Sequence, residues 1–435
     1  MTANTATDPK PAIPGKADNT ILTTYRARTP RSARAFEEAQ RYLPGGNSRQ
    51  AGYWPPYPLT VTRGEGVYIW DLDGNQYIDC LNNYTALVHG HAYGPIVERV
   101  QAQIPNGTCW AANSSAQVEL ARQLVERVAS VEQVRFTNSG TEAGALALLI
   151  ARTVTGRKKI LMARFGYHGA LMEFEVGYSG KGGPDTYLAT YGDLKDFERV
   201  LTEHGEDIAA VFLEPVLGAG GVVAGSKDFI EGVRNAAKKA GALFVLDEVL
   251  TLRLGVGGRQ EALAIQPDLT MFGKLIGGGF PVGAVGGSRD ILDMFNPAHL
   301  KAFHTGTFNG NPVTMAAGAV SVRELTAERI QEMERLASRL KSGLFEAASA
   351  AGLPLSINHI GSLLNLYFTK EPVKTVQERP DTELISKFHL AAMNHGLFLA
   401  SRGLLALSTV MTDAIIDEVI ERAAPAMMDV AQSTH

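Results

Sequence analysis

Two short apolar runs decide the fold: residues 242–249 read ALFVLDEV and residues 268–274 read DLTMFGK. Each has the length of a strand, and each ends near an ionisable side chain, Asp247 in the first run and Lys274 in the second. Strands that are apolar on both sides are typical of a parallel sheet whose two faces are covered. We therefore predict that both runs belong to a mostly parallel sheet in an α/β protein.

The same pattern extends over the middle of the chain, where expected helices and strands alternate. The expected strands are 133–138, 158–163, 208–216, 242–249 and 268–274, and the expected helices are 116–129, 139–156 and 229–241. This alternation predicts a large domain, over residues 73–311, in which helices flank the sheet.

The rest of the sequence predicts a smaller α+β domain. Expected helices over 326–352 and 412–431 accompany expected strands over 362–368 and 403–408, and residues 58–79 alternate like an antiparallel meander. Residues 24–40 predict a helix interrupted at Pro30. Because chain ends often lie together, we expect residues 25–72 to join residues 312–435 in this domain, after a flexible tail over 1–24.

Composition and charge exclude several classes of protein. The 435 residues carry 41 Lys and Arg against 45 Asp and Glu, so a net charge of −4 gives no general attraction for nucleic acid or anionic lipid. No run approaches 18 apolar residues, and the first twenty residues lack the apolar segment of a signal peptide. Cys80 and Cys109 have neither metal-ligand nor disulfide-framework spacing. We expect a cytoplasmic protein that binds no nucleic acid, membrane or metal.

Functional side chains in such a sheet belong at the carboxyl ends of the strands. After the strand 133–138, Ser139, Gly140 and Thr141 open a helix, whose free N–H groups and dipole favour an anion such as phosphate. The same residues could equally form an ordinary helix cap. Taken alone, the three residues leave both interpretations open.

The two ionisable strand ends add chemistry to this edge. A buried Asp247 needs a partner, and Lys274 precedes a glycine run at 277–279 that would let a ligand approach closely. By themselves, Asp247 could make a structural hydrogen bond and Lys274 could be a solvated edge residue. Together with the phosphate cup they match pyridoxal 5′-phosphate, which needs a phosphate site, a carboxylate at its ring nitrogen and a lysine for its aldehyde. Tyr167 would offer a face for its ring.

Nine collinear blocks make the chain resemble the class III aminotransferases, which are fold-type I pyridoxal-phosphate enzymes, over about residues 40–430. The blocks are PGGNSR (44–49), GEGVYIWDLDGNQYID (64–79), HGHAYGPI (89–96), RFTNSGTEA (135–143), GYHG (166–169), FLEPVLGAGG (212–221), LDEVLTLR (246–253), LTMFGKLIGGGFPVGAVGG (269–287) and HTGTFNGNP (304–312).

The resemblance implies a role for each matching residue. Lys274 would bond covalently to the cofactor, and Asp247 would pair with its ring nitrogen. Tyr167 and Val249 would contact the two ring faces, Glu214 would lie beside Asp247, and Ser139, Gly140 and Thr141 would hold the phosphate. Thr307 would reach the phosphate of a neighbouring subunit, which implies a homodimer with shared sites. Many relatives have Gln where this chain has Leu217, so one hydrogen bond to the ring hydroxyl is missing here.

Two arginines bear on the substrate. Arg49 and Arg402 could be ordinary surface residues, but arginine forks bind carboxylates in a bidentate manner. Their positions, and that of Tyr84, are similar to those of β-amino-acid aminotransferases, in which one arginine serves the amino acid and the other the 2-oxo acid. The resemblance thus implies a ping-pong transaminase acting on an aromatic or bulky β-amino acid and on 2-oxoglutarate or pyruvate.

Two other functions stay open. Glutamate-1-semialdehyde 2,1-aminomutases share the PGG block and an early arginine but typically read NSPVRAF and GSWGPMILGH, where this chain reads NSRQAGY and NNYTALVHGH. A non-catalytic binding protein of the same fold is a third hypothesis, which the presence of both Lys274 and Asp247 disfavours. Dinucleotide, P-loop, HExxH and GxSxG motifs are absent from the sequence, and the pair His89 and His91 is weak support for a metal.

Overall fold

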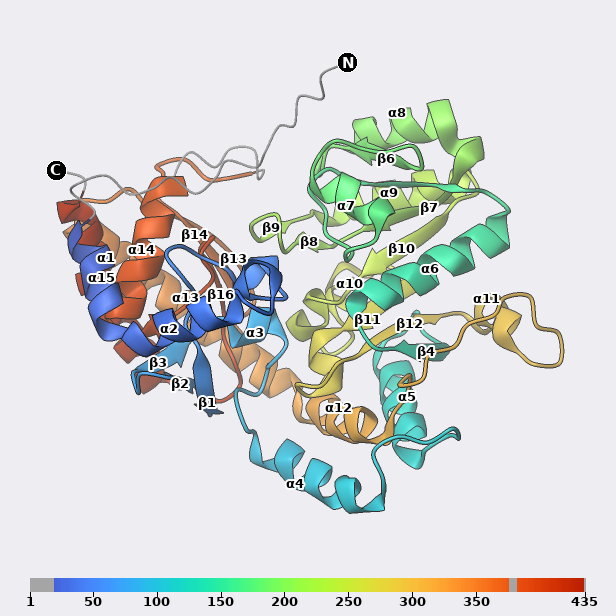
Figure 1. Ribbon diagram of the computed structural model, residues 1–435. Helices are drawn as coiled ribbons and strands as arrows, with labels where there is room; N and C mark the ends of the chain where they lie inside the picture. The colour runs from blue at the N-terminus through green and yellow to red at the C-terminus, as the bar shows by residue number, and fades with distance from the viewer. Residues whose placement is uncertain (1–18, 375–381, 434–435) are drawn as a thin grey trace.

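The structure, a computed structural model, describes residues 19–374 and 382–433 and contains within them a seven-stranded sheet of order β4-β12-β11-β10-β7-β5-β6 (Figure 1). Its strands are β4 (Gln133–Thr137), β5 (Lys159–Ala163), β6 (Thr186–Ala189), β7 (Ile208–Leu213), β10 (Leu243–Asp247), β11 (Leu269–Gly273) and β12 (Gly283–Gly287). Only β12 runs antiparallel to its neighbours β11 and β4. The predicted mostly parallel sheet is confirmed.

Both faces of this sheet are buried because successive side chains point to opposite sides. In β7, Phe212 packs in the core beneath α6, whereas Val211 and Leu213 pack in the core on the other face. The helices on the first face are α6 (Gly140–Thr155) and α7 (Met172–Tyr178), and those on the second face are α5 (Ser115–Arg127), α8 (Leu194–His204), α9 (Lys227–Lys239) and α12 (Pro312–Glu324). Because both faces are buried, these strands need apolar residues at successive positions, which explains their unbroken apolar runs.

The second lobe, on the left in Figure 1, combines the two ends of the chain. Its first sheet has the order β1-β2-β3-β15, with β1 (Val61–Glu65), β2 (Tyr68–Asp71), β3 (Gln76–Asp79) and β15 (Leu397–Phe398). Its second sheet contains β13 (Ser356–Ile360), β14 (Leu363–Tyr367) and β16 (Leu404–Ala406). Its helices are α1 (Asn19–Arg28), α2 (Pro30–Ala39), α13 (Ala327–Ala350), α14 (Thr382–Asn394) and α15 (Asp413–Gln432). The early meander thus pairs with the C-terminal segment.

Short elements occupy the connections between the two lobes and around the large sheet. They are α3 (Asn82–Thr85), α4 (Gly94–Gln103), α10 (Arg259–Leu263), α11 (Arg289–Leu292) and the two-stranded pair β8 (Val216–Leu217) and β9 (Val223–Ala224). Over residues 19–374 and 382–433, no helix has the length and apolar character needed to span a membrane.

The structure corrects the prediction at the N-terminus. Residues 19–24, expected to be part of a flexible tail, form the start of α1, because Ile21 and Tyr25 are buried in the core of the second lobe. The Tyr25 hydroxyl donates to the Tyr57 carbonyl at 2.8 Å, which fixes the helix to the chain before β1. Residues 1–18 of the predicted tail lie outside the described residues, and the domain boundaries stay predictions.

Candidate active site

Five predicted site residues lie at or just beyond the carboxyl ends of strands in the large sheet. Ser139 follows β4, Tyr167 follows β5, Glu214 follows β7, Asp247 ends β10 and Lys274 follows β11. These five strands run in the same direction, because β12 is antiparallel to both β11 and β4, so their carboxyl ends meet at one edge. The fold therefore gathers side chains that are up to 135 residues apart in the sequence.

Asp247 is buried and oriented by two donors. Its Oδ1 accepts from the Val249 N–H at 2.9 Å, and its Oδ2 lies 2.8 Å from His168 Nδ1. The carboxylate makes Nδ1 the donor, which leaves His168 Nε2 as an acceptor in the neutral ring. That Nε2 is buried and has no hydrogen-bond partner among the described residues. His168 also packs against Phe174 and Phe212, with ring centroids 5.6 and 5.8 Å away.

Lys274 begins the 3₁₀ turn η7 (Lys274–Gly277) directly after β11, with a left-handed φ of 51°. Burial lowers the pKa of its amine to about 8, against the opposing charges of Asp247 and Glu214. At this pKa, roughly one amine in ten is neutral at pH 7, compared with less than one in a thousand for an ordinary lysine. Lys274 is consequently suited to attack a carbonyl carbon and to carry a proton.

Glu214 connects the strand ends to the loops above them. Its two oxygens accept from the Tyr167 N–H at 2.8 Å and from the Gly218 N–H at 3.0 Å. Burial raises the pKa of this carboxyl to about 7, with a smaller opposing effect of His168 and a further increase from Asp247. The Tyr167 ring is 44% exposed and contacts Tyr178 edge-on at 5.5 Å, so one face is open to a ligand.

The start of α6 is a helix cap whose geometry also suits an anion. The Ser139 hydroxyl accepts from the Glu142 N–H at 3.1 Å, which is the ordinary capping bond. The first N–H groups of a helix still lack intrahelical partners, so they remain oriented toward an anion. A side chain at Gly140 would come within 3.2 Å of Val249, so glycine permits the close approach of α6 and the end of β10.

These residues fit pyridoxal phosphate. The helix start supplies N–H donors for a phosphate, the oriented Asp247 carboxylate suits a protonated ring nitrogen, and the buried amine of Lys274 suits an aldehyde. Leu217, at the position where many relatives have Gln, is 2% exposed and packs in the core on the α9 side of the sheet. Among the described residues, no three His, Cys, Asp or Glu side chains are placed to share a metal ion.

The second predicted group forms a stack of three side chains. Two guanidinium groups lie over the Tyr84 ring, with Arg49 Cζ 5.5 Å and Arg402 Cζ 5.6 Å from its centroid. Arg49 donates to Asn83 Oδ1 at 2.8 Å, and Arg402 lies 3.5 Å from the Gly218 carbonyl. Because Glu214 binds the N–H of Gly218, this stack is joined to the group around Asp247.

The turn that carries Tyr84 has an unusual backbone. All four residues of α3 are left-handed, with φ of 52° at Asn82, 49° at Asn83, 53° at Tyr84 and 74° at Thr85. A left-handed conformation costs roughly 1–2 kcal/mol per L-residue, so this turn needs external support. The Asn82 side chain provides one support by donating to the Ala406 carbonyl at 2.6 Å.

Thr307 lies on the surface of the single chain. It is exposed, and its carbonyl accepts from Cys109 Sγ at 3.4 Å. Two residues later, Asn309 accepts from the Asn138 amide at 2.6 Å, immediately before α6. The segment around Thr307 therefore lies beside the phosphate cup and remains accessible to another chain.

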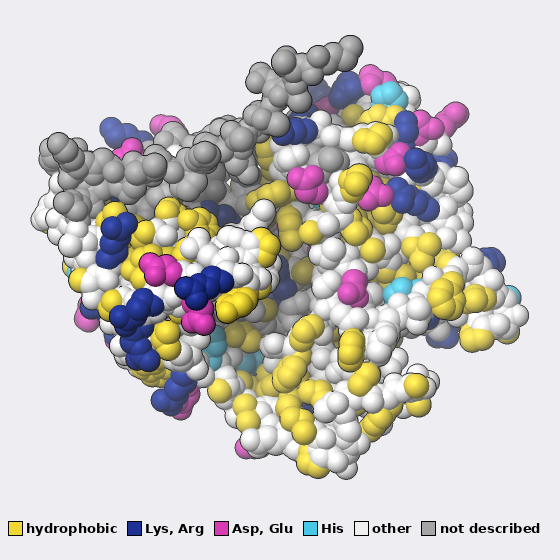
Figure 2. All heavy atoms as spheres, in the orientation of Figure 1, with side chains coloured by type: hydrophobic (Ala, Val, Ile, Leu, Met, Phe, Trp, Pro, Cys, Tyr) yellow, Lys and Arg dark blue, Asp and Glu magenta, His cyan; other side chains and the backbone are white. Residues whose placement is uncertain are grey.

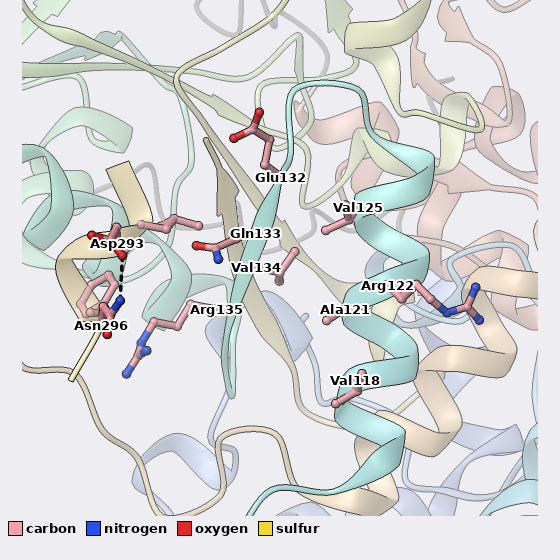
Figure 3. A pocket seen from close by; sticks show the side chains of 12 residues that line it. Val118, Ala121, Arg122, Val125, Glu132, Gln133, Val134, Arg135, Asp293 and Asn296 are labelled. Atoms are coloured by element: carbon pink, nitrogen blue, oxygen red, sulfur yellow. Dashed lines mark hydrogen bonds between the residues drawn. The ribbon is translucent and has the colours of Figure 1, made fainter. Parts of the chain in front are cut away.

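A separate cavity lies away from all these residues. Its volume is about 660 Å³, and it is lined by α5, β4 and the segment 292–296 (Figure 3). No predicted site residue lines it, whereas Arg135 and Asp293 do. This hollow is therefore not part of the candidate site.

The sequence did not identify three residues of the site region, namely His168, Asn83 and Arg253. His168 was visible as the neighbour of Tyr167 in GYHG, and Arg253 closes the block LDEVLTLR, but no local pattern reveals what either side chain contacts. Their partners lie 79 residues away for His168 and up to 168 residues away for Arg253.

Comparisons with known proteins find one family model, relatives and a solved structure that each match most of the chain. A family model described as aminotransferase class-III matches residues 50–430. A glutamate-1-semialdehyde 2,1-aminomutase of Rhodopirellula baltica is 37% identical over 421 residues, or 91% of this chain and 96% of that protein. A β-phenylalanine transaminase of Variovorax paradoxus is 37% identical over 410 residues, covering 93% and 94% respectively. The crystal structure of a β-phenylalanine aminotransferase from the same organism matches with a TM-score of 0.89 at 36% identity, over 94% and 97% of the two chains.

The raised pKa of Glu214 predicts a pH-dependent stability. The folded protein keeps this proton up to about pH 7, whereas the unfolded chain releases it near pH 4.5, so wild-type stability falls between these values. Glu214→Gln removes this effect. In urea unfolding of the cofactor-free protein, the variant should gain up to roughly 3 kcal/mol relative to wild type as the pH rises from 4.5 to 7.5. A stability difference that does not change with pH would contradict the assignment.

Proposed function

The chain belongs to the class III aminotransferases, pyridoxal-phosphate enzymes of fold type I, and we propose that it transfers an amino group from an aromatic or bulky β-amino acid to a 2-oxo acid such as 2-oxoglutarate or pyruvate. The observation that carries the choice of substrate is the stack of Arg49, Tyr84 and Arg402 next to the Glu214 loop. Two guanidinium groups on one side of the site supply a carboxylate fork for each half-reaction.

We propose that each strand end holds one part of the cofactor. The start of α6, with Ser139, Gly140 and Thr141, binds the phosphate, while Tyr167 and Val249 contact the two faces of the ring. Asp247, held by His168, keeps the ring nitrogen protonated. When bound, pyridoxal phosphate supplies an aldehyde and a ring that accepts electrons from the substrate carbon.

Lys274 acts twice in this scheme. Its amine would anchor the aldehyde of the cofactor, and once the substrate amine occupies that position it would serve as the base that carries the proton of the substrate carbon. Burial beside Asp247 lets the amine exist in both protonation states near neutral pH. Arg49 and Arg402 meanwhile orient the carboxylates, and both guanidinium groups are held over the Tyr84 ring.

The aminomutase remains the alternative, since one relative at 37% identity carries that name. An aminomutase rearranges one substrate and needs no separate 2-oxo acid. The presence of both Arg49 and Arg402 over the Tyr84 ring favours two carboxylate substrates in succession. A non-catalytic role is disfavoured because the desolvated Lys274 beside Asp247 serves no packing need.

The site also needs a second copy of the chain in this proposal, with Thr307 reaching the neighbouring subunit's phosphate. Large apolar side chains near Thr307 support it, since Leu300 is 52% exposed, Phe303 76% and Phe308 59%. Figure 2 shows further apolar side chains exposed over α4 and α5. The cytoplasmic location stays a prediction.

Lys274→Ala is expected to abolish turnover because the covalent anchor and the proton carrier are lost together. Borohydride reduction of wild-type holoenzyme followed by peptide mapping should place the label on Lys274, and the variant should show none. Lys159→Ala, at the opposite edge of the sheet, should keep both label and turnover. A label on another lysine would remove the basis of the mechanism.

Arg402→Ala should raise the KM for 2-oxoglutarate about tenfold or more, because a hydrogen bond to a charged group contributes roughly 1.5–3 kcal/mol. The rate with 1-phenylethylamine as donor in the first half-reaction should change much less, since this amine has no carboxylate. Arg199→Ala, on the exposed side of α8, is the control. Unchanged saturation by 2-oxoglutarate would mean that Arg402 does not bind the acceptor.

Phe303→Glu should shift the protein from dimer to monomer, because a charge would replace the most exposed of these aromatic side chains. Light scattering after size-exclusion chromatography measures the mass, and cofactor content should fall with it. Val154→Glu, at the exposed end of α6, should leave the mass unchanged. A wild-type protein that is already monomeric at micromolar concentration would refute the shared site.

A further inference from the structure

Arg253 is among the largest fully buried side chains, and it is a cation without a carboxylate partner. It lies in the 3₁₀ turn η6 (Thr251–Leu254), six residues beyond Asp247. Over the described part of the chain, no Asp or Glu lies within ion-pair distance of its guanidinium. Burying such a group is costly, and an apolar residue of similar volume would fill the same space more favourably.

All the polar contacts of Arg253 are made outside the large sheet. Nε donates to Ser362 Oγ at 2.9 Å, just before β14, and Nη2 donates to the Leu407 carbonyl, just after β16. Nη1 donates to the Thr85 carbonyl at 3.3 Å, at the end of the left-handed turn, and Nη2 lies 3.8 Å from Met333 Sδ in α13. Arg253 therefore links the segment that follows Asp247 to four separate parts of the chain.

The chemistry of these contacts requires an arginine. The acceptors lie in different directions around one planar group, and a guanidinium presents five N–H donors in a fixed fork. A lysine ammonium at the same place could not reach Ser362, Thr85 and Leu407 together. Burial lowers the pKa of Arg253 to about 9, so the group keeps its charge at neutral pH.

The contact with Thr85 supports the strained turn at its second end. The first support is the bond from Asn82 to the carbonyl of Ala406, and the next residue, Leu407, accepts from Arg253. Both ends of the turn are therefore attached to the same place at the end of β16. Tyr84 lies between these two attachments and carries Arg49 and Arg402 on its ring.

We propose that Arg253 is a positioning residue for carboxylate recognition: its guanidinium holds the turn Asn82–Thr85, and through Tyr84 it places Arg49 and Arg402 relative to the strand end that carries Asp247. This inference rests on the proposed function, in which Arg49 and Arg402 bind the carboxylates of the two substrates. It assigns no contact with substrate to Arg253 itself.

Arg253→Lys tests the inference, because it keeps a charge but removes the fork. In the holoenzyme, the KM for 2-oxoglutarate and the inhibition constant of 3-phenylpropanoate should each rise at least about fivefold, since small misplacements of binding groups have large effects. The first half-reaction with 1-phenylethylamine should stay within about twofold of wild type.

Arg157→Lys is the matched control. Arg157 also donates to three carbonyls, those of Gly205, Ile208 and Ala240, but it does so at the amino ends of the strands. This variant should lower the midpoint of thermal unfolding. It should leave the KM for 2-oxoglutarate unchanged relative to the rate of the half-reaction with 1-phenylethylamine. Equal losses for carboxylates and amine in Arg253→Lys would show a merely structural role and overturn the inference.

Asn82→Gly provides a second measurement should Arg253→Lys fail to fold. Glycine accepts the left-handed φ of 52° without strain, but it removes the bond to Ala406. The same selective rise in KM for 2-oxoglutarate supports the inference, and an unchanged KM overturns it. A wild-type enzyme that handles 1-phenylethylamine as well as β-phenylalanine would instead overturn the proposed function and this inference together.

Discussion

A buried carboxylate next to a buried amine is the constraint on which the rest of the site depends. Asp247 is 4% exposed, and its charge is stabilised by His168 and by the Val249 N–H rather than by water. In the low dielectric of this edge, its charge reaches neighbouring groups with little screening. It raises the pKa of Glu214 and opposes the effect of burial on Lys274.

The two lobes divide the work of binding between them. The large sheet presents rigid strand ends, with glycine at 140 allowing α6 to approach Val249 closely. The second lobe contributes Arg402, and the connection between the lobes contributes Tyr84. Groups that must meet a cofactor and two different substrates are thereby held by separate parts of the chain, joined through Gly218 and Arg253.

Several features that break local rules lie around this site. Four consecutive residues, at 82–85, adopt a left-handed backbone, Lys274 does the same, and Arg253 is a buried cation without an acidic partner. Each is unfavourable by itself and persists because surrounding contacts hold it. Their concentration near Asp247 and Tyr84 is what a site shaped by function is expected to show.

The sequence by itself determined five of the seven strands of the large sheet, and it pointed to the ionisable residues at their ends. Apolar runs of strand length identified β10 and β11, and their ends identified Asp247 and Lys274, because burial on both faces leaves only the strand end for an ionisable group. The quoted blocks also identified the family, and the resemblance to class III aminotransferases is confirmed.

Only the tertiary structure decided how the other groups meet. The glycine-rich β12 has little intrinsic strand preference and is fixed by pairing with β11 and β4, and α1 is fixed by burial of Ile21 and Tyr25. The pairing of His168 with Asp247 and the attachment of the turn at 82–85 join residues far apart in the chain. Such contacts leave no periodic signal in the sequence, because they depend on where whole strands and lobes are packed, not on the identity of neighbouring residues.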